Sequence, residues 1–76
     1  MFNVRVSNPQ GSVLQTTTDC VVCKTINGEV SFYPNHVPYL STIDNGYAKI
    51  NDQVIEIKNG SILLDESNNV TILIDE

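Results

Sequence analysis

Turn-forming residues divide this chain of 76 residues into segments that are too short for a long helix. These residues stand at Asn8-Pro9-Gln10-Gly11, Asn27-Gly28, Pro34 to Pro38, Asp44-Asn45-Gly46, Asn51-Asp52, Asn59-Gly60 and Asp65 to Asn69. Proline fixes φ, glycine tolerates the left-handed region, and Asn-Gly favours a type I′ hairpin turn. No window shows helical periodicity over the ~11 residues that would indicate a helix. The chain is therefore predicted to be all-β.

The segments between the turns carry the alternation of a half-buried strand. Phe2, Val4 and Val6 alternate with polar residues, and later Val54 and Glu56 fall on one face of a strand. The predicted strands are Phe2 to Val6, Ser12 to Thr17, Cys20 to Ile26, Val30 to Tyr33, Tyr47 to Ile50, Gln53 to Lys58, Ser61 to Leu64 and Val70 to Ile74. Tyr39 to Ile43 fits either a strand or a short helical turn. We expect one domain, residues 1–76, built as an all-β sandwich.

Charge excludes several kinds of partner. Nine acidic residues against four basic ones give a formal net charge of −5, and the four cations are scattered along the chain. Nucleic acids and anionic membrane surfaces are bound by clustered Lys and Arg, so we expect no direct contact with either. No apolar run approaches the ~20 residues that span a bilayer. The start of the chain lacks the apolar core of a signal peptide, so we expect the protein to stay where it is made.

The reactive side chains are few, and two alternatives use them. Cys20 and Cys23 lie three apart in a predicted strand, so their side chains point to opposite faces and are expected to be incidental. With His36 they supply too few ligands for a zinc site. A nucleophile–base pair would need His36 beside Ser31, Ser41 or a cysteine. A small Cys/His metal-dependent enzyme therefore remains the weaker alternative.

The residues around the proline loop suggest a contact surface. Glu29 follows the Asn27-Gly28 turn and is either a solvated carboxylate or an exposed contact for a polar or basic partner. Phe32 is expected in the core, whereas Tyr33 and Tyr39 are core or interface anchors, because their hydroxyls need a polar partner.

The segment from Asn27 to Leu40, which reads NGEVSFYPNHVPYL, resembles the signature of the epsilon subunit of F-type ATP synthases. That signature has Gly-Glu, a few apolar residues, Pro, Gly or Asn, His, Ala, Pro, an apolar residue and Leu. The likeness continues through IDNGYAKI near the middle and through NGSIL and NVTILID at the end. Departures occur at Cys23-Lys24, where the family has an apolar residue and Pro, and at Ser31 and Ser61, where it has Gly.

The resemblance implies a flattened β-sandwich of short, mostly antiparallel strands that serves as a non-catalytic rotor part without a cofactor. Its expected partners are the gamma subunit and the c-ring, with membrane association only through them, on the cytoplasmic face of a bacterial inner membrane. By position, Gly28, Glu29, Val30 and Ser31 are expected to face the c-ring, and Asn35 and His36 to face gamma. The chain stops where most members continue into a helical hairpin, so inhibition by such a hairpin is not expected. A stand-alone β-sandwich adaptor is the remaining alternative.

Overall fold

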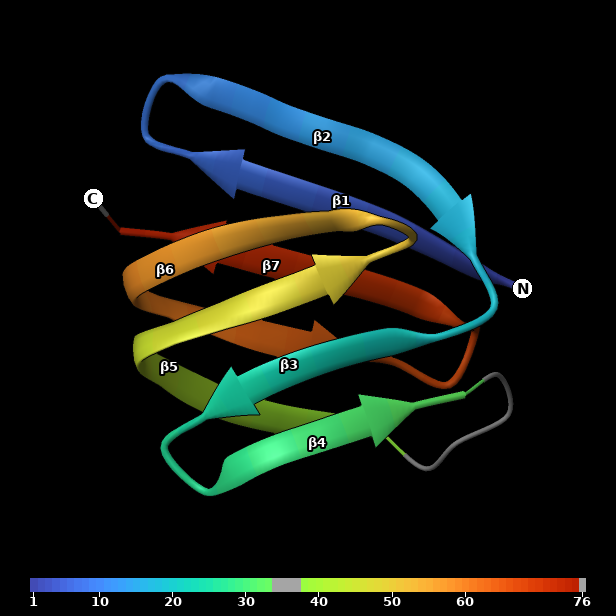
Figure 1. The fold of residues 1–76 in the computed structure, drawn as a ribbon. Helices are drawn as coiled ribbons and strands as arrows, with labels where there is room; N and C mark the ends of the chain where they lie inside the picture. Colours follow the sequence, from blue (N-terminus) through green and yellow to red (C-terminus); the bar gives the residue numbers. More distant parts are fainter. Residues whose placement is uncertain (34–37, 76) are drawn as a thin grey trace.

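The computed structural model describes residues 1–33 and 38–75, and every regular element within them is a strand (Figure 1). The strands are β1 (Phe2–Asn8), β2 (Gly11–Thr18), β3 (Val21–Thr25), β4 (Gly28–Phe32), β5 (Tyr39–Ile50), β6 (Gln53–Leu64) and β7 (Asn69–Ile74). The described part of the chain contains no helix that is long and apolar enough to cross a membrane. The all-β prediction is confirmed.

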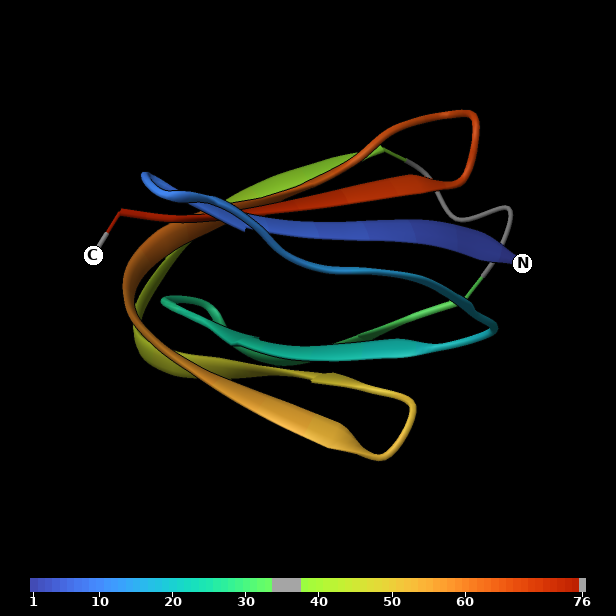
Figure 2. The same cartoon turned by 90° about the horizontal axis from the view of Figure 1, so that it is seen from above.

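The strands form one sheet in the order β2-β1-β7-β6-β5-β3-β4. β1 and β7 pair in parallel, and the other neighbouring strands pair in antiparallel. Figure 2 shows this sheet folded over on itself, with β1 and β7 in one layer and β3 and β4 in the other. β5 and β6 curve together from one layer to the other, so the long strand pair forms the closed side of the sandwich.

Two of the predicted turns are wrong, because β5 and β6 continue through them. Asp44 pairs with Asn59, and Gly46 pairs with Ile57, so the ladder stays in register where turns were expected at Asp44-Asn45-Gly46 and Asn59-Gly60. Asn45 has φ 50°, and this local kink bends the strand without ending it. A Cβ at Gly46 would overlap the backbone oxygen of Lys24. The turn-forming residues therefore make a bend in long strands instead of separating short ones.

The other boundaries follow the sequence pattern more closely. Tyr39 to Ile43 is strand throughout, which decides between the two interpretations of that segment. The predicted strand from Cys20 to Ile26 is shorter, because Cys20 precedes it and Ile26 belongs to the next turn. The turn at Asn51-Asp52 is confirmed, and there Asn51 adopts φ 54°.

The core lies between the two layers and is filled by alternate residues of the strands. Its fully buried apolar residues are Phe2, Val4, Val6, Val21, Cys23, Phe32, Ile43, Ala48, Ile50, Ile57, Ile62, Leu64, Val70 and Ile72. The predicted faces of β6 are confirmed, because Val54 and Glu56 are exposed whereas Ile57 is buried. Burying this apolar surface supplies the main favourable free energy of folding.

Candidate functional site

The residues predicted to face a partner lie on the hairpin formed by β3 and β4. Thr25 pairs with Gly28, so the loop consists of Ile26 and Asn27, one residue earlier than predicted. Gly28 has φ 102°, whereas Asn27 is not in the left-handed region. A type I′ turn needs positive φ at both central residues, so the prediction of that turn type is wrong.

Hydrogen bonds hold the tip of this hairpin against β5. The Thr25 hydroxyl accepts a hydrogen bond from the backbone N–H of Asn27 at 3.0 Å and donates to the carbonyl of Gly28 at 3.2 Å. The Ile26 N–H donates to the carbonyl of Thr42 at 3.1 Å. The Asn27 side-chain amide donates to the hydroxyl of Ser41 at 3.4 Å. The two Thr25 bonds order the tip itself, and the bonds to Thr42 and Ser41 fix it to β5, a strand that is distant in the chain.

The predicted contact residues are open to a partner. Gly28, Glu29 and Ser31 are exposed, and Val30 is partly buried against the core. β4 stands at the end of the strand order, so no described strand pairs with the outer edge of Gly28 to Ser31. An edge strand offers backbone N–H and C=O groups in addition to its side chains. The hairpin can therefore bind a partner through both.

Glu29 belongs to a row of polar side chains that crosses four strands of the outer face. It lies opposite Lys24, which lies opposite Tyr47, and Tyr47 lies opposite Glu56. The Tyr47 hydroxyl donates a hydrogen bond to a carboxylate oxygen of Glu29. This hydrogen bond, reinforced by desolvation and by the negative charge of Glu29, raises the pKa of Tyr47. No pattern along the sequence indicated Tyr47, because its partner is 18 residues away.

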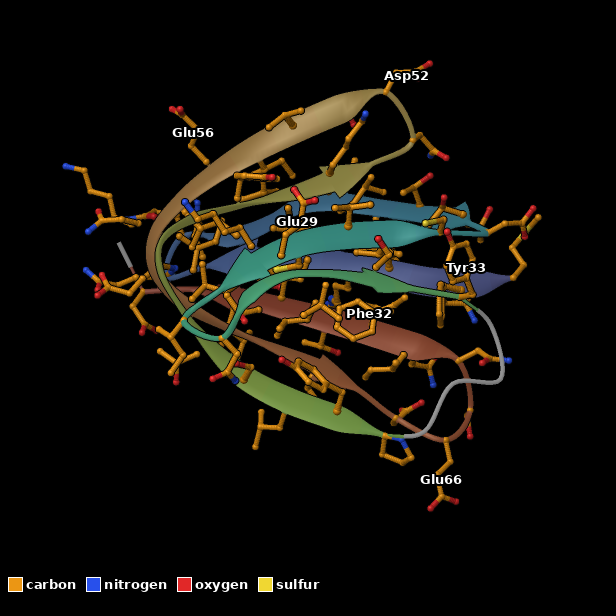
Figure 3. All side chains as sticks on the ribbon, turned by 60° about the horizontal axis from the view of Figure 1, so that its bottom comes forward. Glu29, Phe32, Tyr33, Asp52, Glu56 and Glu66 are labelled. Carbon is orange, nitrogen blue, oxygen red and sulfur yellow. The ribbon has the colours of Figure 1, made fainter. Side chains whose placement is uncertain are left out.

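The aromatic residues beside the proline loop separate into core and surface. Phe32 is buried and packs against Tyr39 with ring centroids 5.0 Å apart, and Figure 3 shows the Phe32 ring below β4, between the layers. Hydrogen bonds with Ser41, Thr25 and Asn27 lower the pKa of Tyr39. Tyr33 is exposed and lies at the far end of β4 from the hairpin tip (Figure 3). Tyr39 thus supports the core, and Tyr33 is available at the surface.

The predicted gamma-facing residues, Asn35 and His36, lie outside the described residues. Among the described residues, no three His, Cys, Asp or Glu side chains are close enough to hold a metal ion. Cys20 and Cys23 are free thiols. Burial raises the pKa of Cys23 to about 11, which keeps this thiol protonated and unreactive at neutral pH.

An exposed apolar patch lies on the outer face of the other layer, and sequence reasoning did not find it. Leu40 pairs with Leu63 between β5 and β6. On the neighbouring strand β7, Leu73 pairs with Ser61 and therefore lies diagonally from Leu63 on the same face. We call these three residues the leucine patch; 71%, 46% and 48% of their surfaces are exposed. Alternation in the sequence would have placed them outside, but only the strand order brings them together.

A surface depression lies away from the hairpin. It has a volume of about 680 Å³ and is lined mainly by polar side chains of β1, β2 and β7, among them Arg5, Gln15 and Thr71. The candidate site is thus an exposed edge and face, as expected for a protein–protein contact, and is not a cavity for a small molecule.

The chain matches a known protein family along its whole length. The family model described as "ATP synthase, Delta/Epsilon chain, beta-sandwich domain" matches residues 1–76. The chain therefore belongs to the family of ATP synthase delta/epsilon β-sandwich domains.

Several relatives carry the name ATP synthase epsilon chain. The protein from Desulfitobacterium hafniense is 38% identical over 77 residues, which cover 97% of this chain and 58% of the relative. The protein from Ligilactobacillus salivarius is 42% identical over 55 residues, or 70% of this chain and 40% of the relative. A chloroplastic epsilon chain from Marchantia polymorpha is 31% identical, over 100% of this chain and 58% of the relative. The chain thus spans 40–58% of the length of these relatives.

A solved structure shares the fold. It is a chain in the central stalk/c-ring structure of the Tetrahymena thermophila mitochondrial ATP synthase, with a TM-score of 0.83 and 14% identity. The match covers 99% of this chain and 63% of that chain. It supports the sandwich architecture independently of close sequence similarity.

Proposed function

We propose that this chain is a non-catalytic rotor subunit of a proton-translocating F-type ATP synthase, where it links the gamma subunit to the c-ring. The family match over the whole chain carries the proposal, because the named relatives are epsilon chains and the matched fold occurs in a central stalk. A closely packed sandwich suits this role, since a packed interior has low compressibility and transmits force between its surfaces.

The hairpin is the proposed contact with the c-ring. Gly28, Glu29 and Ser31 are exposed on an edge strand whose tip is fixed to β5. A fixed polar edge fits the polar loops of a membrane ring better than an apolar edge would. Its polar groups lose hydrogen bonds to water on binding but can form new ones with the loops. The chain would then reach the membrane only through the ring, on the cytoplasmic face of a bacterial membrane.

The proposed contact with gamma uses Asn35, His36 and the leucine patch. Leu40 is largely exposed at the start of β5, and Leu63 lies directly opposite it. Exposed apolar residues that cluster on one sheet face are typical of a protein interface. Among the described residues, the proposal therefore places the c-ring contact and the leucine patch on different layers of the sandwich.

Co-purification tests the assignment of partners. The tagged chain should capture gamma and the c-ring from an epsilon-depleted ATP synthase preparation, and proton pumping should recover when it is added back. Glu29→Ala should weaken capture of the ring, whereas Glu56→Ala, at the other end of the same row, should not. His36→Ala should weaken capture of gamma.

Two results would contradict the proposal. Capture of neither gamma nor the ring above background would favour a stand-alone adaptor. Equal loss in the Glu29 and Glu56 variants would show that the ring binds the whole charged row and not the hairpin in particular.

A further inference from the structure

The Glu29 carboxylate is directed over the sheet and not outward from the edge of β4. Figure 3 shows its side chain rising from β4 and extending across β3. It lies opposite Lys24 on β3, which in turn lies opposite Tyr47 on β5. The Tyr47 hydroxyl donates its hydrogen bond to Oε2 of this carboxylate.

Tyr47 is held more firmly than the glutamate that it contacts. It lies on β5, which is paired with β3 on one side and with β6 on the other. Tyr47 is partly buried, whereas Glu29 is exposed on an edge strand. The flexible Glu29 side chain, which stands on the edge strand β4, is therefore connected to the internal strand β5 by one hydrogen bond.

We propose that Tyr47 is a positioning residue for Glu29 in the contact with the c-ring. The hydrogen bond uses Oε2 and limits the rotamers of the side chain, so that Oε1 remains available for a donor on the partner. Ordering a long side chain before binding reduces the entropy that binding would otherwise cost. The partner group is an N–H or O–H donor or a cation, since a carboxylate only accepts hydrogen bonds.

The neighbouring charges favour the same arrangement. Lys24 lies between Glu29 and Tyr47 in the row, where its positive charge attracts the negative carboxylate toward β3. Glu56 lies on the far side of Tyr47 and disfavours movement of the Glu29 carboxylate further across the sheet. Buried Cys23, the neighbour of Lys24 in β3, is kept protonated by its raised pKa of about 11. The row thus places the carboxylate over β3.

This inference rests on the proposed function, and its first test measures binding of the c-ring. The complex of the chain with gamma is titrated with purified c-ring. Tyr47→Phe keeps the ring but removes the hydroxyl, and should weaken binding about 2- to 12-fold, as expected when one side chain must be ordered on binding. The matched control is Tyr33→Phe, which removes a hydroxyl from an exposed tyrosine on the chain's surface.

A double variant separates positioning from a direct contact. Tyr47→Phe combined with Glu29→Ala should bind no more weakly than Glu29→Ala alone, because the hydroxyl acts only through the carboxylate. If Glu29→Ala weakens binding while Tyr47→Phe binds like wild type, the positioning role is overturned and the proposed function stands. If Glu29→Ala has no effect, the proposed contact with the ring fails, and the positioning role fails with it.

The second test needs no partner. The pKa of Tyr47 is followed by NMR titration of its ring carbons in the full chain. Glu29→Gln should lower this pKa toward the ordinary tyrosine value, because the charged acceptor that raises it is removed. Glu56→Gln, which removes the same charge on the other side of Tyr47, should have a smaller effect. Equal effects of the two variants would overturn the proposal, since the hydrogen bond would then not distinguish Glu29.

Discussion

The Asp65 carboxylate closes the turn between β6 and β7. One oxygen accepts hydrogen bonds from the backbone N–H groups of Ser67 at 2.8 Å and Asn69 at 3.0 Å. The other accepts one from the Asn69 side chain at 3.2 Å. These hydrogen bonds lower the pKa of Asp65, and the bond from the Asn69 backbone has the largest effect. Such side-chain-to-backbone bonds are the usual reason why Asp is favoured in turns.

Replacing Asp65 should make stability less dependent on pH. Folding lowers the pKa of Asp65, so its ionised carboxylate stabilises the folded state. This stabilisation is fully present above the unfolded-state pKa of 3.8, and it is lost as the pH falls through the lower pKa of the folded state. Asp65→Asn should therefore lower the unfolding temperature at pH 7 and lower it by less at pH 2. Thermal unfolding followed by circular dichroism measures both differences.

The control for this variant is Glu66→Gln, which removes the same charge from an exposed neighbour in the turn. Its unfolding temperature should stay close to that of the wild type. A loss in Glu66→Gln as large as that in Asp65→Asn would mean that charge alone matters, and that the hydrogen bonds contribute nothing.

At the scale of elements, the bend in β5 and β6 depends on two glycines. Gly46 approaches the backbone of Lys24 in β3, and Gly60 approaches the backbone of Leu73 in β7. A Cβ at either position would overlap a carbonyl oxygen of the neighbouring strand. Each glycine therefore allows a close approach of strands where the sheet passes from one layer to the other.

Gly60→Ala should destabilise the protein by about 1–3 kcal/mol, because the overlap with the Leu73 carbonyl can be relieved only by moving a strand. Urea unfolding measures the change in the free energy of unfolding. Ser61→Ala, at the next and partly buried position, should change it by much less. Similar midpoints for the glycine variant and wild type would show that the bend does not need the close approach.

The hairpin shows how far sequence reasoning reaches at this scale. The sequence correctly predicted a turn near Asn27-Gly28 and an exposed Glu29. It placed the turn one residue late, because Thr25 supplies its hydroxyl to the loop and Ile26 bonds to Thr42 of a distant strand. Turn propensity is local, whereas the register of this hairpin is also set by β5.

For the whole molecule, stability should depend on the inner faces of the strands and very little on the outer ones. Ile72 and Leu73 are neighbours in β7, a strand paired on both sides, yet Ile72 is 0% exposed and Leu73 48%. Ile72→Ala should cost about 2–5 kcal/mol through lost burial and a cavity. Leu73→Ala should stay within about 0.5 kcal/mol.

Denaturant unfolding of both variants measures this difference. Each variant shortens an aliphatic side chain to alanine, and the two side chains lie on opposite faces of β7. A large loss in the Leu73 variant of the isolated chain would contradict exposure of the leucine patch. If Leu73→Ala instead weakens only binding of gamma, the result supports the proposed use of that patch.

The sequence by itself determined the all-β class, the alternating faces of β1 and β6, and an exposed Glu29 beside a turn. These properties are local, because alternation and turn chemistry act over a few residues. The tertiary structure decided that Asp44 to Gly46 and Asn59 to Gly60 bend two long strands, and that Tyr47 reaches Glu29. Both depend on strands that are distant in the chain but adjacent in the sheet, and the sequence pattern of a single strand carries no information about its neighbours.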